Sequence, residues 1–327
     1  MRKAICLAAL CLFILNGPAL AGEPRWYKGN THTHTNKCDG NEWPRRVVRW
    51  YVDHEYSFLV ITDHNIVTPT AFLDTDENDD FLLIPGEEVT DRAEGKPVHM
   101  CAIGIDTAVA PRHGKSIVET LRNDLTAVRA AGGIAVINHP NWKYAFGAKE
   151  LAEVKDARFL EVYNVTKESN NLAAGGMPGT ENIWDALLAR GMLVYGLVAD
   201  DTHDYTGEFS SEMANPGRGW IMVRADALTR EAITAAIEKG DFYGSTGVVL
   251  KNVSVTDREY TVEIAPAGDV RFTTLFIGKG GTVLKEDFGR TARYEIRGDE
   301  GYVRAKVLCS TGDFAITQPV LVAPRSK

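Results

Sequence analysis

Six of the eight histidines in this chain lie in short polar clusters spread over about 170 residues. Each cluster follows or lies within an apolar run, which is where a β-strand would end. The clusters are Thr31–His34, Thr62–His64, Pro85–Glu88, Val98–His99, Asn138–Pro140 and Asp200–His203. Neutral imidazoles and carboxylates are ligands of Zn, Mn and Fe, and groups that converge from several strand ends can hold more than one ion. We therefore expect a fold that brings many strand ends to one metal site.

Strand-like and helical segments alternate from about Arg25 to Leu250. The strands are predicted at Trp26–His32, Phe58–Thr62, Phe81–Ile84, Val98–Ile105, Ile134–Asn138, Phe159–Tyr163, Leu193–Val198 and Trp220–Val223. The helices are predicted at Glu42–His54, Ser116–Ala131, Glu181–Arg190 and Thr229–Lys239. Ser116 and Glu119 have the spacing of a capping box, and Gly132-Gly133 supplies a helix stop. Such alternation is typical of a parallel barrel or a doubly wound sheet.

The positions of the clusters favour the barrel. His32, His64, Glu88, His139 and Asp201 each stand at the end of a different predicted strand. In a barrel, catalytic groups from many strands meet at one face, whereas a doubly wound sheet concentrates its site near one switch point. The fold class is therefore predicted as α/β, a TIM-like (β/α) barrel over residues 22–250.

After Leu250 the pattern changes to runs that alternate with period two, which is typical of antiparallel strands. The runs are Val253–Val255, Tyr260–Ile264, Phe272–Ile277, Ala292–Ile296 and Tyr302–Leu308, and Gly-rich turns such as Gly278–Gly281 separate several of them. We expect a small antiparallel β-sandwich over residues 251–327. It contains no cluster of metal-ligating residues.

Residues 1–21 have the pattern of a signal peptide. Arg2-Lys3 is the charged start, Ala4–Leu15 is apolar, and Ala19–Ala21 is a small-residue cleavage site. The apolar run is too short to span a bilayer, so we expect an exported protein, periplasmic or secreted, with no membrane span after the leader is removed. Of five cysteines, Cys38, Cys101 and Cys309 then remain. Cys38 and Cys101 form either a disulfide or a pair of free, buried thiols.

The charge excludes one class of partner. The formal net charge is −8, and without the two cations of the leader it becomes −8 − 2 = −10. An acidic chain whose longest basic run is Arg45-Arg46 is a poor candidate for binding nucleic acid. The expected partner is a small-molecule substrate, and the oligomeric state is not defined by the sequence.

Residue spacing within the clusters favours chelation. His32 and His34 lie on the same side of an extended chain and can bind one ion, and Asp201 and His203 repeat that spacing. Asp63 is either an acceptor that orients an imidazole or a helix N-cap, and at Pro85-Gly86 a turn is expected to aim Glu87 or Glu88 inward. Any one histidine can be a hydrogen-bonded core residue, but all six clustered histidines are not explained in that way. Metal ions held by them would lower the pKa of bound water towards neutrality.

In their order, the motifs HTHT, TDH, PGEE, VH, NHP and DDTH resemble those of the polymerase and histidinol phosphatase (PHP) superfamily, over about Trp26–Leu250. The resemblance implies a distorted (β/α)7 barrel with two or three divalent ions (Zn, Mn or Fe) at its C-terminal face. The implied metal ligands are His32, His34, Asp39, His64, Glu88, His99, His139, Asp201 and His203.

The resemblance also implies how the ligands are shared. His32, His34, Glu88 and Asp201 would hold the first ion. Glu88, favoured over Glu87 by the family pattern, would bridge to a second ion on His99 and His139. Asp39, His64 and His203 would hold the third. Asp39 departs from the pattern, because many members have histidine there.

The activity implied is that of a metal-dependent phosphoesterase in which a metal-bridging hydroxide attacks phosphorus. Glu88, Asp201 and His203 are the expected catalytic groups, Asp201 as base or orienting group and His203 as proton donor. Lys37 and Arg218 are candidate phosphate clamps, and each is also readable as a solvated surface charge.

Two alternatives stand beside this activity. NHPNW, EVYN, DDTH, FYGSTG and the signal peptide resemble a secreted subgroup that includes enzymes similar to carbaryl hydrolase, which cleave aryl carbamate esters. In that case Trp142, Tyr144 and Tyr163 would form a pocket for an aryl group, or they simply pack the rim of the barrel. The other alternative is a metal-binding domain without turnover.

Overall fold

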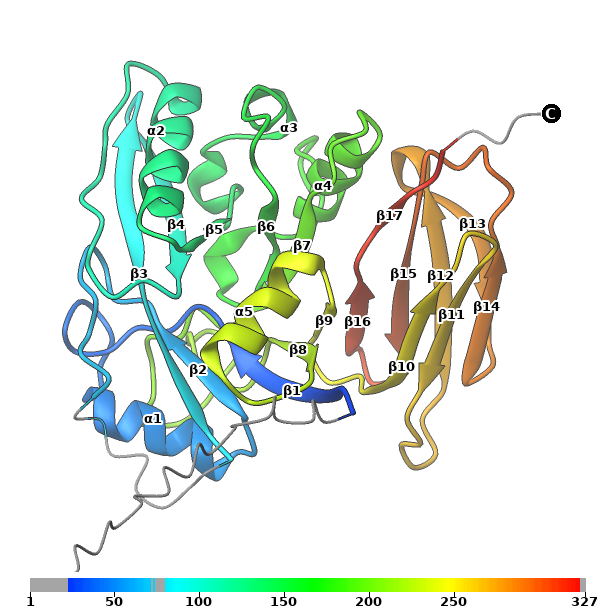
Figure 1. Cartoon of the computed structure of the whole chain (residues 1–327), viewed down its shortest axis with the longest axis horizontal. Helices are drawn as coiled ribbons and strands as arrows, with labels where there is room; N and C mark the ends of the chain where they lie inside the picture. Colours follow the sequence, from blue (N-terminus) through cyan, green and yellow to red (C-terminus); the bar gives the residue numbers. More distant parts are fainter. Residues whose placement is uncertain (1–22, 72, 74–79, 324–327) are drawn as a thin grey trace, which may run out of the picture.

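The computed structural model describes residues 23–323 except 72 and 74–79 (Figure 1). The predicted signal peptide lies outside the described residues. Within the described ranges no helix is both long enough and apolar enough to cross a membrane.

The described part of the chain is a mixed α/β structure built on one large sheet of fourteen strands. The strands of the first part of the chain are β1 (Arg25–Asn30), β2 (Phe58–Ile61), β3 (Leu82–Ala93), β4 (Lys96–Ile103), β5 (Ile134–Ile137), β6 (Phe159–Asn164), β7 (Tyr195–Ala199), β8 (Trp220–Ala225) and β9 (Phe242–Ser245). They follow one another in the order β9-β8-β1-β2-β3-β4-β5-β6-β7. β7 comes back beside β8 and β9. No strand ladder joins β7 to them among the described residues, so the predicted closed barrel is not shown.

Strand direction departs from the parallel arrangement that the sequence predicted. β1, β2 and β3 are parallel, as are β5, β6 and β7, but β4 runs antiparallel to both β3 and β5, and β8 antiparallel to β1. For β4 the cause lies at Glu94-Gly95, where both residues have positive φ (54° and 75°). This two-residue loop, with the conformation typical of tight hairpins, returns the chain directly into β4 without a crossover helix.

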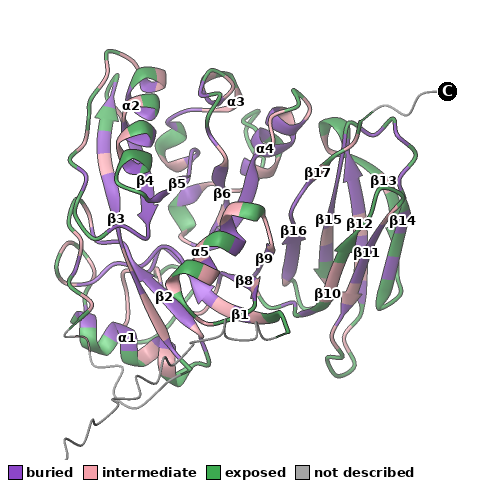
Figure 2. Ribbon diagram, in the orientation of Figure 1, coloured by how far each residue is buried: buried purple, intermediate pink, exposed green. Residues whose placement is uncertain are grey.

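The helices cover the sheet with one apolar face each (Figures 1 and 2). They are α1 (Pro44–Asp53), α2 (Ile117–Ala130), α3 (Ala148–Leu151), α4 (Thr180–Leu188) and α5 (Arg230–Lys239), with short 3-10 turns η1 (Trp142–Tyr144), η2 (Lys167–Ser169) and η3 (Lys279–Gly281). The predicted cap of α2 is present, because the Ser116 side chain accepts a hydrogen bond from the Glu119 N–H. The core side chains of α2 pack among those of β3, β4 and β5.

The last part of the chain is antiparallel, as predicted. It contains β10 (Leu250–Val255), β11 (Glu259–Ile264), β12 (Phe272–Gly278), β13 (Thr282–Asp287), β14 (Thr291–Glu295), β15 (Tyr302–Cys309), β16 (Phe314–Thr317) and β17 (Val320–Leu321). β10, β11 and β14 form a separate sheet, and its buried Tyr260 and Tyr294 share a core with Phe276 of β12. β16, however, pairs with β9, so the layer containing β12 and β15 continues the large sheet. The predicted self-contained sandwich is therefore not confirmed.

A buried ion pair and a glutamine fasten this part to the rest. The guanidinium of Arg304 in β15 donates to both oxygens of Asp185 in α4, at 2.8 and 2.7 Å. The side-chain amide of Gln318, just after β16, pairs with Gly196 of β7. Its Oε1 accepts from Gly196 N at 2.8 Å, and its Nε2 donates to Gly196 O at 2.9 Å. The Gln318 side chain thus satisfies the N–H and C=O of Gly196, where a neighbouring strand would otherwise do so.

Gln318→Leu is expected to lower the free energy of unfolding by about 2–4 kcal/mol, because it leaves the buried N–H and C=O of Gly196 without partners. Urea unfolding followed by circular dichroism measures the loss. A loss below about 0.5 kcal/mol would show that water replaces the amide and that β7 does not depend on this contact.

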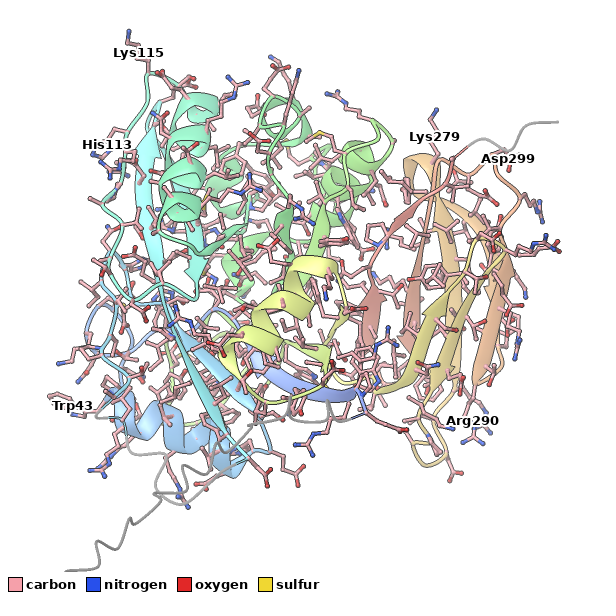
Figure 3. All side chains as sticks on the ribbon, in the orientation of Figure 1. Trp43, His113, Lys115, Lys279, Arg290 and Asp299 are labelled. Atoms are coloured by element: carbon pink, nitrogen blue, oxygen red, sulfur yellow. The ribbon has the colours of Figure 1, made fainter. Side chains whose placement is uncertain are left out.

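A second prediction concerns Asp124 of α2, which is fully buried and accepts a hydrogen bond from Arg112 N at 2.8 Å. Burial raises the pKa of Asp124 to about 6, with a further contribution from the nearby Asp91 carboxylate. Asp91 in turn holds His113, whose side chain points outward at the edge of the molecule (Figure 3). Because the pKa is raised in the folded state, this contribution to stability is complete below about pH 4 and is lost as the pH rises through about 6.

Asp124→Asn removes that titration and keeps an acceptor for Arg112 N. Between pH 4 and pH 7 the urea midpoint of the variant should therefore rise relative to that of the wild type. Both proteins are compared after treatment with a chelator, so that metal loss at low pH does not contribute. A difference that stays flat across this range would contradict the raised pKa.

Candidate metal centre

The clustered histidines and carboxylates come together at one end of the first seven strands. His32 and His34 follow β1, His64 follows β2, His139 follows β5, and Asp201 and His203 follow β7, while Glu88 and His99 lie inside β3 and β4. Glu88 was predicted to sit after a turn at Pro85-Gly86. That turn is absent, because these residues belong to the long strand β3. Gly86 is needed there for a different reason: a Cβ would lie 2.7 Å from Ala102 O of β4 and from a methyl of Val60 in β2.

Three donor atoms form a nearly equilateral triangle. His32 Nε2, His34 Nε2 and Asp201 Oδ1 are each 3.1 Å from the other two. Glu88 adds a fourth donor, with Oε1 3.4 Å from His32 Nε2 and Oε2 3.6 Å from His34 Nε2. Ligands about 2.0–2.1 Å from one tetrahedral ion stand about 3.3 Å apart. A proton can bridge one edge of the triangle, whereas a cation at its centre satisfies all of its corners.

Two further donor groups adjoin the triangle. On one side, His139 Nε2 and His99 Nδ1 lie 3.3 and 3.2 Å from Glu88 Oε1. On the other side, Asp39 has one oxygen 3.3 Å from His64 Nε2 and the other 3.3 Å from His203 Nε2. One donor atom from each of Asp39, His64, His203 and His34 lies within 4.8 Å of the others. The structure thus brings together all nine residues predicted as ligands, in three overlapping groups.

The hydrogen-bond partners of two imidazoles leave lone pairs pointing at the centre. His32 Nδ1 lies 2.5 Å from Glu161 Oε1, and His203 Nδ1 lies 2.9 Å from the Asp201 carbonyl oxygen. A proton on each Nδ1 satisfies these acceptors and leaves Nε2 free to bind a cation. Burial lowers the pKa of His34 and of His99, which favours neutral, ligating rings. For His32, His64, His139 and His203 the neighbouring carboxylates outweigh burial and raise the pKa, so a bound cation would take the place of a proton there.

The buried carboxylates of the centre stay ionised. Burial by itself raises the pKa of Glu88, but His99 and His32 outweigh it and hold that pKa well below its usual range. For Asp201 too, burial is outweighed, mainly by His32 and His34, and the pKa is low. Asp201 has φ of 49°, in the left-handed region that Asp tolerates better than most residues. Its other oxygen accepts from Asn164 Nδ2 at 3.0 Å, so Oδ1 is held towards the triangle.

Several buried polar residues that support the donors were not assigned a role from the sequence. Glu161 accepts from His139 N as well as contacting His32, and Asn138 Nδ2 donates to Glu88 Oε1 at 2.7 Å. Asp200 accepts from the N–H groups of three consecutive residues, Gly217–Gly219. For Glu161 the sequence did contain a signal of a buried role, since this carboxylate stands between Leu160 and Val162 in an otherwise apolar strand.

Asp63 was expected either to orient an imidazole or to cap a helix. It does neither by any contact described. Its two oxygens accept from the N–H and the hydroxyl of Thr35, at 2.7 and 2.8 Å, and thereby fix the segment that carries His34. Cys38, Cys101 and Cys309 are free thiols, so the disulfide alternative is not adopted.

The three donor groups open into a cleft of about 320 Å³. Trp142 lines it, as the sequence predicted for a substrate-binding residue, and so do Lys167 and Glu212 from the loops after β6 and β7. Lys37 and Arg218, the predicted phosphate clamps, do not. The Lys37 ammonium lies 5.9 Å from the centre of the Trp43 ring, and the Arg218 guanidinium donates to Met213 O at 2.9 Å. Lys167 is the cation that the cleft contains, and sequence pattern alone gave no reason to choose it.

Neighbouring glutamates provide a matched test of the site. Glu87 and Glu88 point to opposite faces of β3, and Glu87 accepts from Val109 N at 2.5 Å, away from the histidines. Glu88→Gln is expected to lose at least one equivalent of bound metal, because a neutral amide neither balances the charge nor bridges two cations. Glu87→Gln should keep the full complement. Elemental analysis after dialysis measures both, and equal losses from the two variants would refute the placement of the centre.

No protein-family profile matches the chain, and no curated protein matches it. The chain does match several solved structures. A two-domain protein of Bacteroides vulgatus containing a predicted PHP-like metal-dependent phosphoesterase is 17% identical, with a TM-score of 0.49 over 94% of this chain and 97% of that one. A putative metal-dependent phosphoesterase of Bifidobacterium adolescentis is 18% identical, with a TM-score of 0.38 over 55% and 89%. An amidohydrolase of Chromobacterium violaceum is 16% identical, with a TM-score of 0.42 over 54% and 88%.

Proposed function

We propose that this protein is a metal-dependent hydrolase of phosphate esters of small molecules. The observation that carries the proposal is the triangle of His32, His34 and Asp201, 3.1 Å on each side, with the Glu88 carboxylate facing it. Imidazole and carboxylate donors at these separations are the ligand set of divalent Zn, Mn or Fe. We also propose export from the cytoplasm, on the pattern of residues 1–21.

The residues present fit two or three such ions. His32, His34, Asp201 and Glu88 would hold the first, Glu88 with His99 and His139 the second, and Asp39 with His64 and His203 the third. When bound, divalent ions would supply positive charge to the phosphoryl oxygens and would lower the pKa of bound water towards neutrality. The net charge of the cleft supports this occupancy, because Asp39, Glu88, Asp201, Asp204, Glu168 and Glu212 line it against one lysine.

The chain's own groups then handle the protons and the substrate. Asp201, whose Oδ1 is held at the centre, is placed to accept a proton from the attacking water. With only the first two ions bound, His203, which lines the cleft and has Nδ1 3.8 Å from Asp201 Oδ1, keeps its Nε2 free to carry a proton. As the bond from phosphorus to the ester oxygen breaks, it is placed to give that proton to the leaving oxygen. Lys167 can pair with a phosphoryl oxygen by leaving Glu212.

A carbonyl substrate is the second candidate. Trp142 on the wall of the cleft would suit the aryl group of a carbamate or ester, and the same donors would serve attack at carbon. We place phosphorus first because three contiguous donor groups suit several ions around a multiply charged phosphoryl group.

The deciding experiment is a side-by-side assay of an aryl phosphate, an aryl phosphodiester and an aryl carbamate, with metal content determined on the same samples. We expect release of phosphate from the monoester, loss of activity with a chelator and recovery with added divalent metal. Asp201→Asn, which keeps a side chain tolerant of positive φ, should lower kcat/KM by about 10²–10⁴-fold. Glu87→Gln is the matched control and should retain activity.

Other outcomes separate the alternatives. Carbamate turnover without phosphate release would overturn the choice of phosphorus. Stoichiometric metal with no turnover of any ester would favour a binding protein. If His139→Ala or Asp201→Asn kept both metal and activity, the assignment of the centre would fail.

A further inference from the structure

A second hollow, of about 560 Å³, opens directly beside the metal cleft. The two share four lining side chains, which are Trp142, Lys167, Glu168 and Glu212. Lys143, Tyr144 and Asn170 line the remainder of the hollow. Because the shared residues form a continuous wall, a molecule bound at the metal centre can extend into this space.

Trp142 places an aromatic surface at the junction. Its ring centre lies 5.1 Å from that of His99 and 5.5 Å from that of His139, so a group lying on Trp142 is next to the proposed second ion. The Lys143 ammonium stands 4.2 Å from the centre of the same ring. Lys143 is exposed, so this face of the indole is covered by a side chain that can withdraw into solvent.

The backbone holds Trp142 in position. Trp142 N donates to His139 O at 2.9 Å, so the indole is tied to a residue of the metal centre. The next two residues, Lys143 and Tyr144, both have positive φ, 54° and 47°. Non-glycine residues are strained in this conformation, and such strain is concentrated at functional sites. The Lys143 carbonyl accepts from Lys96 Nζ at 2.8 Å, which helps to fix the turn.

The other lining groups shared with the metal cleft are polar, and two of them are exposed. Lys167 and Glu212 form an ion pair across the two loops, and their side chains are 63% and 65% exposed. Glu168 accepts a long hydrogen bond, 3.4 Å, from the indole Nε1. The hollow therefore combines an aromatic surface with hydrogen-bonding groups beside it. A flat ring with polar edges matches this shape, whereas a bulky saturated group gains nothing from the indole face.

From these features we infer that the hollow is a leaving-group subsite, which binds a planar aromatic group stacked on Trp142 while the ester's phosphoryl group lies at the metal centre. The inference rests on the proposed function only for the identity of the reacting group. Trp142 acts here as a specificity-determining residue, and none of its atoms takes part in the reaction.

The test compares benzyl phosphate with cyclohexylmethyl phosphate, two esters of primary alcohols with leaving groups of similar size and basicity. Aromatic pairs gain about 0.5–1.5 kcal/mol beyond area burial, so the wild-type protein should favour the benzyl ester about fivefold in kcat/KM. The difference should arise in KM, because stacking is present before the bond breaks. Cyclohexylmethyl is the more hydrophobic group, so burial of apolar area alone predicts the opposite preference.

Variants locate the preference. Trp142→Leu should reduce the ratio to about one, and Trp142→Phe should retain part of it. Trp43 provides the matched control, since it is 61% exposed, lines neither hollow and points outward at the edge of the molecule (Figure 3). Trp43→Leu should keep the wild-type ratio.

Equal kcat/KM for the two esters, or a preference that persists in Trp142→Leu, would overturn the subsite and leave the proposed function standing. The wild-type comparison needs no variant, so it remains decisive if Trp142→Leu does not fold. If neither ester releases phosphate, the proposed function fails, and calorimetric binding of benzylphosphonate and cyclohexylmethylphosphonate to the metal-loaded protein decides the subsite. Tighter binding of the benzyl compound in the wild type, lost in Trp142→Leu, supports it; equal binding, or binding of neither, overturns it.

Discussion

The Glu88 carboxylate is the group on which the rest of the centre depends. It is 1% exposed, and its two oxygens contact five imidazoles, of His32, His34, His64, His99 and His139. An ionised carboxylate taken out of water is costly unless it is paired and hydrogen-bonded. Here the compensation comes from residues after β1, β2 and β5 and within β4, so one side chain of β3 joins residues carried by four other strands.

The metal centre was more predictable from the sequence than the fold was. Ligands of one ion must be near each other, so clusters such as His32–His34 and Asp201–His203 indicate a shared site whatever the order and direction of the strands. The β3–β4 hairpin was missed because Glu94-Gly95 is a weak local signal. Its effect is to reverse β4, which makes the pairings of β4 with both β3 and β5 antiparallel. Glu161 was missed for a related reason: within an apolar strand a single carboxylate looks like an interruption, and its meaning depends on His32, which is 129 residues away.

Two lysines, one predicted for the cleft and one found in it, illustrate what spacing cannot tell. Lys37 lies two residues before Asp39, but the loop turns its ammonium towards Trp43. Lys167 lies in no histidine cluster and reaches the cleft because the turn after β6 carries it there. Loop paths are set by contacts such as those of Asp200 with Gly217–Gly219, in which a buried side chain binds backbone groups. These contacts leave no periodic trace in the sequence.

The bond between Gln318 and Gly196 joins residues 122 positions apart. β7 carries the last donors of the centre, Asp201 and His203, at its end. β7 pairs with β6, but the N–H and C=O of its Gly196 are satisfied by a side chain that is synthesised much later. A ribosome therefore releases all nine donor residues before the residue that completes the hydrogen bonding of β7 has emerged.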